Sequence, residues 1–195
     1  MSALDESEVS RCLSEYFRGR CLNPLGKRSP FTHRDDSLER SFQIDLAIGP
    51  TCTLGNRTPE QVPADRAAFD EAAVLIDPEV DRLLGLSVFP KDQRSIKSWN
   101  WMANPNPVYG LAIEIENNTS SKYFLGSLLA AAIAGRWGFL IVPDSPEIPR
   151  WIETLNRMMH KGVQSPIPCN VSVFSWPSLQ EYLNQEVEQG IPPGA

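Results

Sequence analysis

Two glutamates stand two residues apart in a strand-like segment of the sequence. In GLAIEIE, residues 110–116, apolar side chains alternate with Ala112, Glu114 and Glu116. Because strand side chains point to opposite faces in turn, the two carboxylates would lie about 6–7 Å apart on one face. Like charges that close raise each other's pKa unless a cation lies between them, and a divalent metal is such a cation. The pattern predicts a metal-binding pair or, in the plainer interpretation, the solvated face of an edge strand.

A third acid lies in another strand-like segment. Residues 41–49, SFQIDLAIG, alternate in the same way, and Asp45 is their one charge, with only glutamine and alanine beside it on its own face. A surface strand usually carries more polar residues, so Asp45 is expected to be partly buried and paired. Asp77 is a rival because it lies nearer to Glu114 in the sequence. Asp45 is preferred because its strand pattern is cleaner.

The residues after Glu116 predict a βαβ unit that would position the acidic strand. Residues 119–121, Thr-Ser-Ser, are types that favour a helix N-terminus. Small residues such as Gly126 would let the helix lie close to a sheet, and Gly135 and Gly138 offer C-cap positions. Residues 139–142 form an apolar run typical of a buried parallel strand. The buried stripe predicted for this helix is Phe124, Leu125, Leu128, Leu129, Ala132 and Ile133.

The remaining segments complete an α/β pattern. A helix is expected at residues 7–18, capped by Ser7, and one or two helices are expected at 65–84. These last helices belong to a segment at about 50–107 that would be either an insertion packing over the sheet or an extra strand plus a helix. A helix, a short strand and a last helix are expected after residue 144.

Composition indicates an ordinary globular protein. The chain has 195 residues, of which 42% are hydrophobic and 22% charged, which suits a single domain over 1–190 with a tail at 191–195. No run approaches the roughly 20 apolar residues of a membrane span. The N-terminus lacks the basic and apolar regions of a signal peptide, so a cytoplasmic protein is expected. The four cysteines show no paired spacing, which argues against a zinc site.

The charge is uneven along the chain. The net charge of −6 argues mildly against nucleic-acid binding. From Arg11 to Arg34, however, there are six basic residues and one acid, Glu15. This segment predicts either a local basic surface that a phosphate backbone would meet or a solvated charge run.

Taken in order, these acids resemble the PD-(D/E)XK nuclease superfamily. The likeness covers roughly residues 8–142 and is closest in QIDLAIGP, around Asp45, and in AIEIENNTSSKYFLGSLLAAAIAG, around Glu114. The resemblance implies an α/β fold with a mixed central sheet flanked by helices, in a restriction endonuclease-like αβββαβ core. It also implies a metal-dependent endonuclease that hydrolyses DNA, related to restriction or defence.

The resemblance assigns a role to each acid. Asp45 and Glu114 would bind Mg²⁺ or Mn²⁺, which makes a nucleophile from water. Glu116 stands where the family usually has lysine and would orient or deprotonate that water. Lys122 would supply the positive charge that the family's usual lysine provides. Glu15 would be an accessory carboxylate from the first helix. DNA is the expected partner, and cutting both strands would suit a homodimer.

Departures from the family pattern leave two other interpretations open. E-x-E replaces E-x-K, so the fold could instead serve as a catalytically inactive binding or assembly module. The interval from Asp45 to Glu114 is long, so the insertion must loop out. An unrelated α/β protein would instead pair these acids with Arg136 or Arg40.

Overall fold

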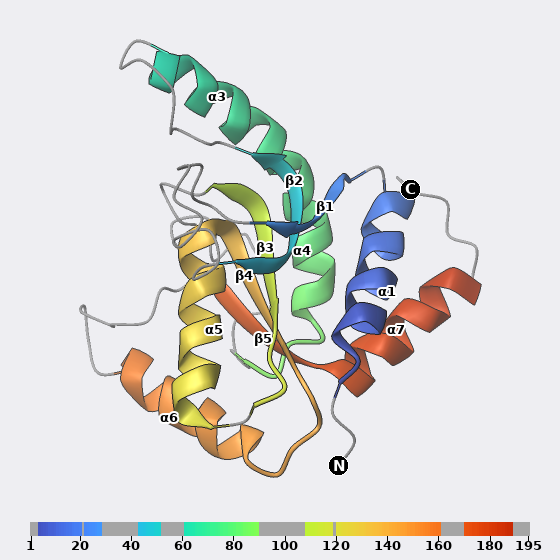
Figure 1. Ribbon diagram of the computed structural model, residues 1–195, viewed down its shortest axis with the longest axis vertical. Helices are drawn as coiled ribbons and strands as arrows, with labels where there is room; N and C mark the ends of the chain where they lie inside the picture. The colour runs from blue at the N-terminus through green and yellow to red at the C-terminus, as the bar shows by residue number, and fades with distance from the viewer. Residues whose placement is uncertain are drawn as a thin grey trace.

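A five-stranded mixed sheet lies between two layers of helices (Figure 1). The computed structural model describes residues 4–20, 22–28, 43–51, 61–89, 108–118, 120–160 and 170–188. The elements in these ranges are α1 (Glu6–Gly19), β1 (Pro24–Arg28), β2 (Ile44–Thr51), α3 (Gln61–Ala73), η1 (Val74–Ile76), α4 (Asp77–Leu84), β3 (Tyr109–Ile115), α5 (Ser121–Ala134), β4 (Gly135–Val142), α6 (Ile148–His160), β5 (Val171–Ser175) and α7 (Trp176–Glu188). No helix within them has the length and apolar character needed to cross a membrane.

The strands follow one another across the sheet in chain order. β2 runs antiparallel to both β1 and β3, whereas β3, β4 and β5 are parallel. α5 makes the crossover between β3 and β4, so the predicted βαβ unit and the mixed α/β sheet are both confirmed. With the segment between β2 and β3 set aside, the order from the N-terminus is α1, β1, β2, β3, α5, β4.

One face of the sheet is covered by α1, α4 and α7. Leu13 of α1, Val80 of α4 and Leu183 of α7 belong to one core cluster with Ile113 and Phe139 of the sheet. These strand residues alternate with those that face α5, as period two requires. The three helices therefore share a single hydrophobic core, although they come from distant parts of the sequence.

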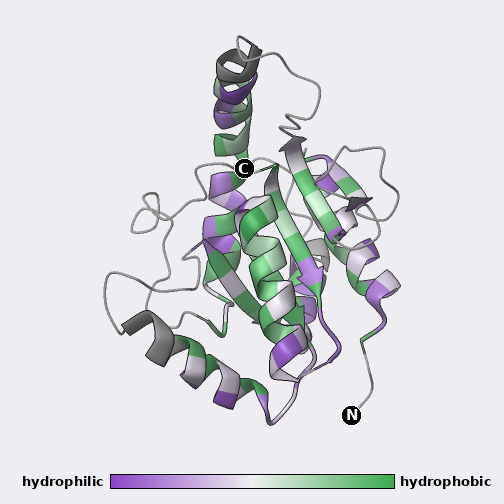
Figure 2. Ribbon diagram, turned by 60° about the vertical axis from the view of Figure 1, so that its left-hand side comes forward, coloured by the Kyte–Doolittle hydropathy of each residue, from purple (hydrophilic) through white to green (hydrophobic). Residues whose placement is uncertain are grey.

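α5 covers the opposite face with a stripe that matches the predicted one at Phe124, Leu128 and Ala132 and differs from it elsewhere. Its buried residues are Phe124, Leu128, Ala131, Ala132 and Ala134. Leu129 and Ile133, which were predicted to be buried, are 37% and 58% exposed, and Figure 2 shows hydrophobic colour along most of this helix. The reason is close packing, because a Cβ at Gly138 of β4 would lie only 2.8 Å from the backbone of Ala131. The alanine side of the helix therefore faces the sheet. Gly126 is not part of this contact, since a Cβ there would meet nothing within 4 Å.

The helix ends agree only partly with the predicted caps. Asp5, not Ser7, caps α1, because its Oδ1 accepts hydrogen bonds from the backbone N–H groups of Ser7 at 3.0 Å and Glu8 at 3.3 Å. Gly135 caps α5 as predicted and is also the first residue of β4. Gly138 lies inside β4 and caps no helix.

The segment between β2 and β3 contains the helices that were predicted at residues 65–84. α4 packs over the sheet through the shared core, while α3 extends away from it (Figure 1). η1 fixes the path between them by placing Ile76 against two glycines. A Cβ added to Gly49 or to Gly110 would lie only 2.2 Å from the Cδ1 atom of Ile76, so neither position has room for a side chain. Gly49 also has a φ of +83°, which favours glycine.

A buried ionic network ties this segment to α1 and α7. Glu79 of α4 is 6% exposed, and its Oε2 lies 3.0 Å from Arg20 Nε and 3.4 Å from Arg82 Nη1. Arg20 also pairs with Glu186 of α7, and its guanidinium lies 3.7 Å from the centroid of the Tyr16 ring. The Tyr16 hydroxyl donates to Glu79, and burial, together with this carboxylate, raises the pKa of the phenol. The network joins three helices through one arginine.

Replacing Arg20 with methionine should destabilise the protein by about 2–3 kcal/mol. Breaking a buried pair leaves an uncompensated charge and costs about 3–5 kcal/mol, and Arg82 retains part of the compensation here. Urea unfolding at neutral pH measures the loss. Arg11→Met is the matched control, because the Arg11–Glu15 pair is 60% and 57% exposed and its removal should leave the unfolding midpoint nearly unchanged. Equal midpoints for the two variants would contradict a stabilising role for the network.

Candidate functional site

Asp45 and Glu114 lie opposite each other on adjacent strands. β2 and β3 pair with Leu46 opposite Ile113 and Ala47 opposite Ala112. Continued by one residue, this register sets Asp45 opposite Glu114, and directly opposite residues of an antiparallel pair share a face. The backbone N–H of Ile115 donates to Asp45 Oδ2 at 3.0 Å, which fixes that carboxylate at the end of β3. The predicted convergence of two strand-borne acids is therefore present.

The pair lies on the side of the sheet that α5 covers. Ala47 and Ala112, the neighbours of these acids on their own face, pack with Ala134 of α5 in one small cluster. Alanines let the helix approach, and the longer carboxylate of Glu114 lies near the end of β3. The sequence thus places two acids at the carboxyl edge of β3, beside a helix that shields them from water on one side.

Glu114 is the strongly perturbed member of the pair. It is 8% exposed, and its Oε1 atom is buried without a hydrogen-bond partner. Burial is the largest cause that raises the pKa of Glu114 to about 9, followed by repulsion from Asp45, a hydrogen bond with Asp45 and repulsion from Glu116; Lys27 opposes the rise. A buried carboxyl with one unsatisfied oxygen and a second carboxylate beside it provides oxygen ligands for a hard cation.

Lys27 is a site residue that sequence reasoning missed. Its Nζ lies 3.2 Å from Asp45 Oδ1, and its side chain is 59% exposed. β1 carries register shifts on either side of Gly26, whose φ is +68°. Such a bulge re-aims the next side chain, so alternation in the sequence gives no signal for the direction of Lys27. The sequence had marked Lys27 only as one member of a basic segment.

Glu116 follows Glu114 on the same face and is held by the connection to α5. Its Oε1 accepts from the backbone N–H of Asn118 at 2.6 Å, and its Oε2 accepts from the Ser127 hydroxyl at 2.8 Å. Both oxygens therefore have partners, and the side chain has a fixed orientation near Glu114. This contrasts with Glu114, whose Oε1 has none.

In the described part of the chain, Lys122 and Glu15 make their recorded contacts with residues other than Asp45 and Glu114. Lys122 is exposed at the start of α5, with its Nζ 5.9 Å from the centroid of the Tyr123 ring, and it pairs with no carboxylate of the described residues. Glu15 is 57% exposed on α1 and pairs with Arg11 at 3.1 Å. The positive charge next to the carboxylates comes from Lys27 instead.

The rival acid Asp77 has partners of its own. Its Oδ2 lies 3.2 Å from Arg136 Nη2, and its Oδ1 accepts from Trp137 Nε1 at 2.7 Å. The pairing with Arg136 considered from the sequence therefore exists, but it involves Asp77 rather than Asp45 or Glu114. Arg40, the other arginine considered, lies outside the described residues.

Three of the six basic residues in the segment from Arg11 to Arg34 are paired with acids within the fold. Arg11 pairs with Glu15, Arg20 pairs with Glu79 and Glu186, and Lys27 pairs with Asp45. Arg18 and Arg28 are exposed, and Arg34 lies outside the described residues.

Comparisons with protein-family models, with curated proteins and with solved structures found no match.

The donor set fits a magnesium-like cation held by two carboxylates. Within the described residues, no three His, Cys, Asp or Glu side chains are grouped so that they could hold a metal ion. Mg²⁺ does not need such a cage, because it keeps several waters and binds through one or two carboxylates together with substrate phosphates. The unpartnered Glu114 Oε1 and the carboxylate of Asp45 are the atoms that would hold it.

Proposed function

We propose that the protein is a metal-dependent endonuclease that hydrolyses phosphodiester bonds of DNA, in a restriction or defence setting. The observation that carries this proposal is the cross-strand pair of Asp45 and Glu114, with an unpartnered buried oxygen on Glu114. Mg²⁺ or Mn²⁺ would be the cofactor. When bound, the cation would neutralise charge developing on the phosphate and activate a water molecule.

The order of elements supports a restriction endonuclease-like core. The sequence α1, β1, β2, β3, α5, β4 is an αβββαβ arrangement, and Asp45 and Glu114 stand on its second and third strands. α3, η1 and α4 fall between these two strands. They account for the long interval that separates the acids in the sequence.

Four side chains of the site would have distinct roles in cleavage. Asp45 and Glu114 would hold the cation, and Lys27 would replace the lysine that E-x-E lacks. Lys27 lies 3.2 Å from Asp45, and an ammonium group has three donors, so two remain for a phosphate oxygen. Glu116, held by Ser127 at 2.8 Å, accepts a proton from the attacking water.

Conversion of supercoiled plasmid to nicked circles tests the activity. The protein should nick plasmid in Mg²⁺ or Mn²⁺ and should leave it intact in EDTA. Circular DNA without ends distinguishes endonucleolytic cleavage from digestion by an exonuclease. Intact plasmid in both metals, over a range of DNA sequences, would contradict the proposal.

Lys27→Met should slow cleavage about a hundredfold, the usual cost of losing one transition-state donor. The loss should also shift the pH–rate profile, because Lys27 lowers the pKa of Glu114. Lys27→Arg keeps the charge and should recover part of the rate. A profile unchanged in Lys27→Met would mean that this ammonium does not act on the carboxylate pair.

A second candidate is the same fold used as a binding or assembly module without catalysis. The observation that favours it is Glu116, both oxygens of which are engaged in holding the β3–α5 connection. Calorimetry would separate the two functions. Binding of DNA or of a protein partner, with no cation bound at millimolar Mg²⁺ or Mn²⁺, would support the module and exclude the enzyme.

A further inference from the structure

A groove beside α1 shares two residues with the carboxylate site. It has a volume of about 420 Å³, and Lys27 and Asp45 line it together with Ser10, Arg11 and Ser14 of α1. α1 lies beside β1 and β2, the strands that carry Lys27 and Asp45 (Figure 1). Because Asp45 would also hold the cation, a ligand bound at the cation has this groove directly next to it.

Serines form the α1 wall of the groove. Ser7, Ser10 and Ser14 stand three and four residues apart, so they lie on one face of the helix. The buried face of α1 is a different one and includes Val9 and Leu13. From Ser7 to Ser14 the helix rises by about 10 Å, which is the axial length of about three nucleotides of one DNA strand.

Two of the three serine hydroxyls are free to contact a ligand. The Ser7 hydroxyl donates to Asp5 Oδ1 at 2.7 Å, within the cap of α1. Ser10 and Ser14 are half-buried, and among the described residues neither hydroxyl has a hydrogen-bond partner. Serine hydroxyls commonly donate to phosphate oxygens of DNA, and such contacts fix the position of the duplex without reading its sequence.

The charged side chains that line the groove balance one another. Arg11 and Lys27 are matched by Glu6 and Asp45. Glu6 is engaged, because its Oε1 accepts from Asn117 Nδ2 at 3.2 Å. A cation held at Asp45 would turn the balance positive and attract phosphate. DNA would therefore be held mainly by hydrogen bonds in the metal-free groove, and more tightly once the cation is bound.

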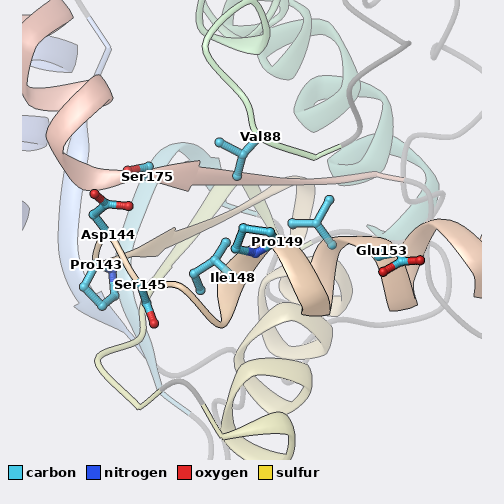
Figure 3. A pocket seen from close by; sticks show the side chains of 9 residues that line it. Val88, Pro143, Asp144, Ser145, Ile148, Pro149, Glu153 and Ser175 are labelled. Carbon is cyan, nitrogen blue, oxygen red and sulfur yellow. The ribbon is translucent and has the colours of Figure 1, made fainter.

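A cavity at the opposite edge of the sheet does not fit this role. It lies beside β5 and α6, and Figure 3 shows Val88, Ile148 and Pro149 gathered around it. These walls are apolar, and the cavity shares no lining residue with the Asp45–Glu114 site. The groove beside α1 is therefore the better place for a charged strand.

We propose that this groove seats the sugar–phosphate backbone of a DNA strand next to the phosphate that is cleaved, an inference that rests on the proposed function. Ser10 and Ser14 would donate to phosphate oxygens. A guanidinium group has five N–H donors, so Arg11 would pair with a phosphate while it keeps its contact with Glu15 at 3.1 Å. α1 would thus position the strand while the carboxylate pair acts on the adjoining phosphate.

Fluorescence anisotropy with a labelled DNA duplex in EDTA tests the groove without cleavage. The pKa of Glu114 is raised to about 9, so at neutral pH this carboxyl keeps its proton and adds no charge that would repel the duplex. The duplex should bind with a Kd of about 10⁻⁵ M at physiological salt. Ser10→Ala and Ser14→Ala should each weaken binding about threefold, the net worth of one hydrogen bond.

Charge variants locate the strand in the groove. Ser10→Glu places a carboxylate beside the phosphates and should weaken binding about tenfold at low salt. Arg11→Gln should reduce the slope of log Kd against log salt by about one, because one phosphate fewer is neutralised. Ser178→Glu adds the same charge at an exposed position on α7 outside the groove and should change the affinity little. Alanine and glutamate favour helices more than serine does, so these variants should fold.

The outcomes separate this inference from the proposed function. Equal binding by Ser10→Glu and Ser178→Glu, or an unchanged salt slope in Arg11→Gln, would overturn the groove and leave plasmid nicking as evidence for the nuclease. Weaker binding by the groove variants, with plasmid left intact by the natural protein, would overturn the nuclease and leave a DNA-binding surface. No binding of the duplex by the natural protein would overturn both.

Discussion

Asp45→Asn and Glu114→Gln should each reduce plasmid cleavage by about a thousandfold, the scale expected when a group that holds the catalytic charge is lost. Each substitution keeps the shape of the side chain and removes the negative charge that a cation requires. The two effects should not add, because losing either carboxylate dismantles the same site. Cleavage rates of the two single variants and the double variant, at saturating Mg²⁺, measure this.

Asp77→Asn is the matched control for this comparison. The Asp77 and Asp45 side chains are 14% and 16% exposed, and each faces one cation, Arg136 and Lys27 respectively. Because Asp77 lies with Arg136 and Trp137 rather than with Glu114, its loss should leave the cleavage rate unchanged. Loss of activity in Asp77→Asn, with Asp45→Asn still active, would move the site to the rival acid.

Without divalent metal, Glu114→Gln should be more stable than the natural protein by about 3–5 kcal/mol at pH 8. The pKa of Glu114 is raised from an ordinary value of 4.5 to about 9. Below pH 4.5 both native and unfolded chains carry the proton, so Glu114 imposes no penalty. Between the two pKa values only the native state keeps it, and stability falls by about 1.4 kcal/mol for each pH unit. Glutamine mimics the protonated side chain and removes this dependence.

Urea unfolding in EDTA at pH 4, 6 and 8 checks this expectation. The two proteins should have nearly equal midpoints at pH 4, and the variant should gain progressively towards pH 8. Glu181→Gln, at an exposed position on α7, should follow the natural protein at every pH. A natural protein as stable as Glu114→Gln at pH 8 would mean that Glu114 ionises in the fold without penalty, contrary to the burial of its carboxyl.

Glu114 is expected to lower the stability of the metal-free protein and to be required for its activity. A carboxyl that is kept buried beside another acid weakens the native state when no cation is present, and it is retained where that strain serves a site. The same substitution should therefore stabilise the protein and abolish its activity. A purely structural glutamate would give neither result.

The face shared by Asp45 and Glu114 could be predicted because strand alternation depends only on neighbouring residues. Each acid interrupts a run of apolar residues with period two, so its face follows from the sequence. Their pairing register could not be predicted in the same way, because the two strands are far apart in the sequence. Asp45 and Ile115, the residue after Glu114, are 70 positions apart. The structure supplied that register.

Lys27 and the stripe of α5 show where sequence patterns fail. The bulge at Gly26 sets the direction in which the Lys27 side chain points. A bulge interrupts the alternation of side chains along a strand, and this alternation is what allows the face of a residue to be predicted. α5 is apolar on nearly every side, so spacing alone could not choose between its leucine and alanine sides. The choice is made by Gly138 on β4, which only the three-dimensional packing brings against Ala131. The failure at α5 concerns a contact between elements, whereas at Lys27 the strand β1 itself was not predicted from the sequence, which had indicated loop or short turns over residues 19–39.

Calorimetric titration of Mn²⁺ or Mg²⁺ at pH 7.5, in two buffers with different ionisation enthalpies, tests the carboxylate site most directly. Because metal binding requires the ionised ligand and the pKa of Glu114 is about 9, each bound cation should release about one proton. Glu114→Gln should abolish the proton release, and Asp45→Asn should weaken binding. Absence of binding at millimolar cation, or binding that neither substitution changes, would contradict a metal site at Asp45 and Glu114.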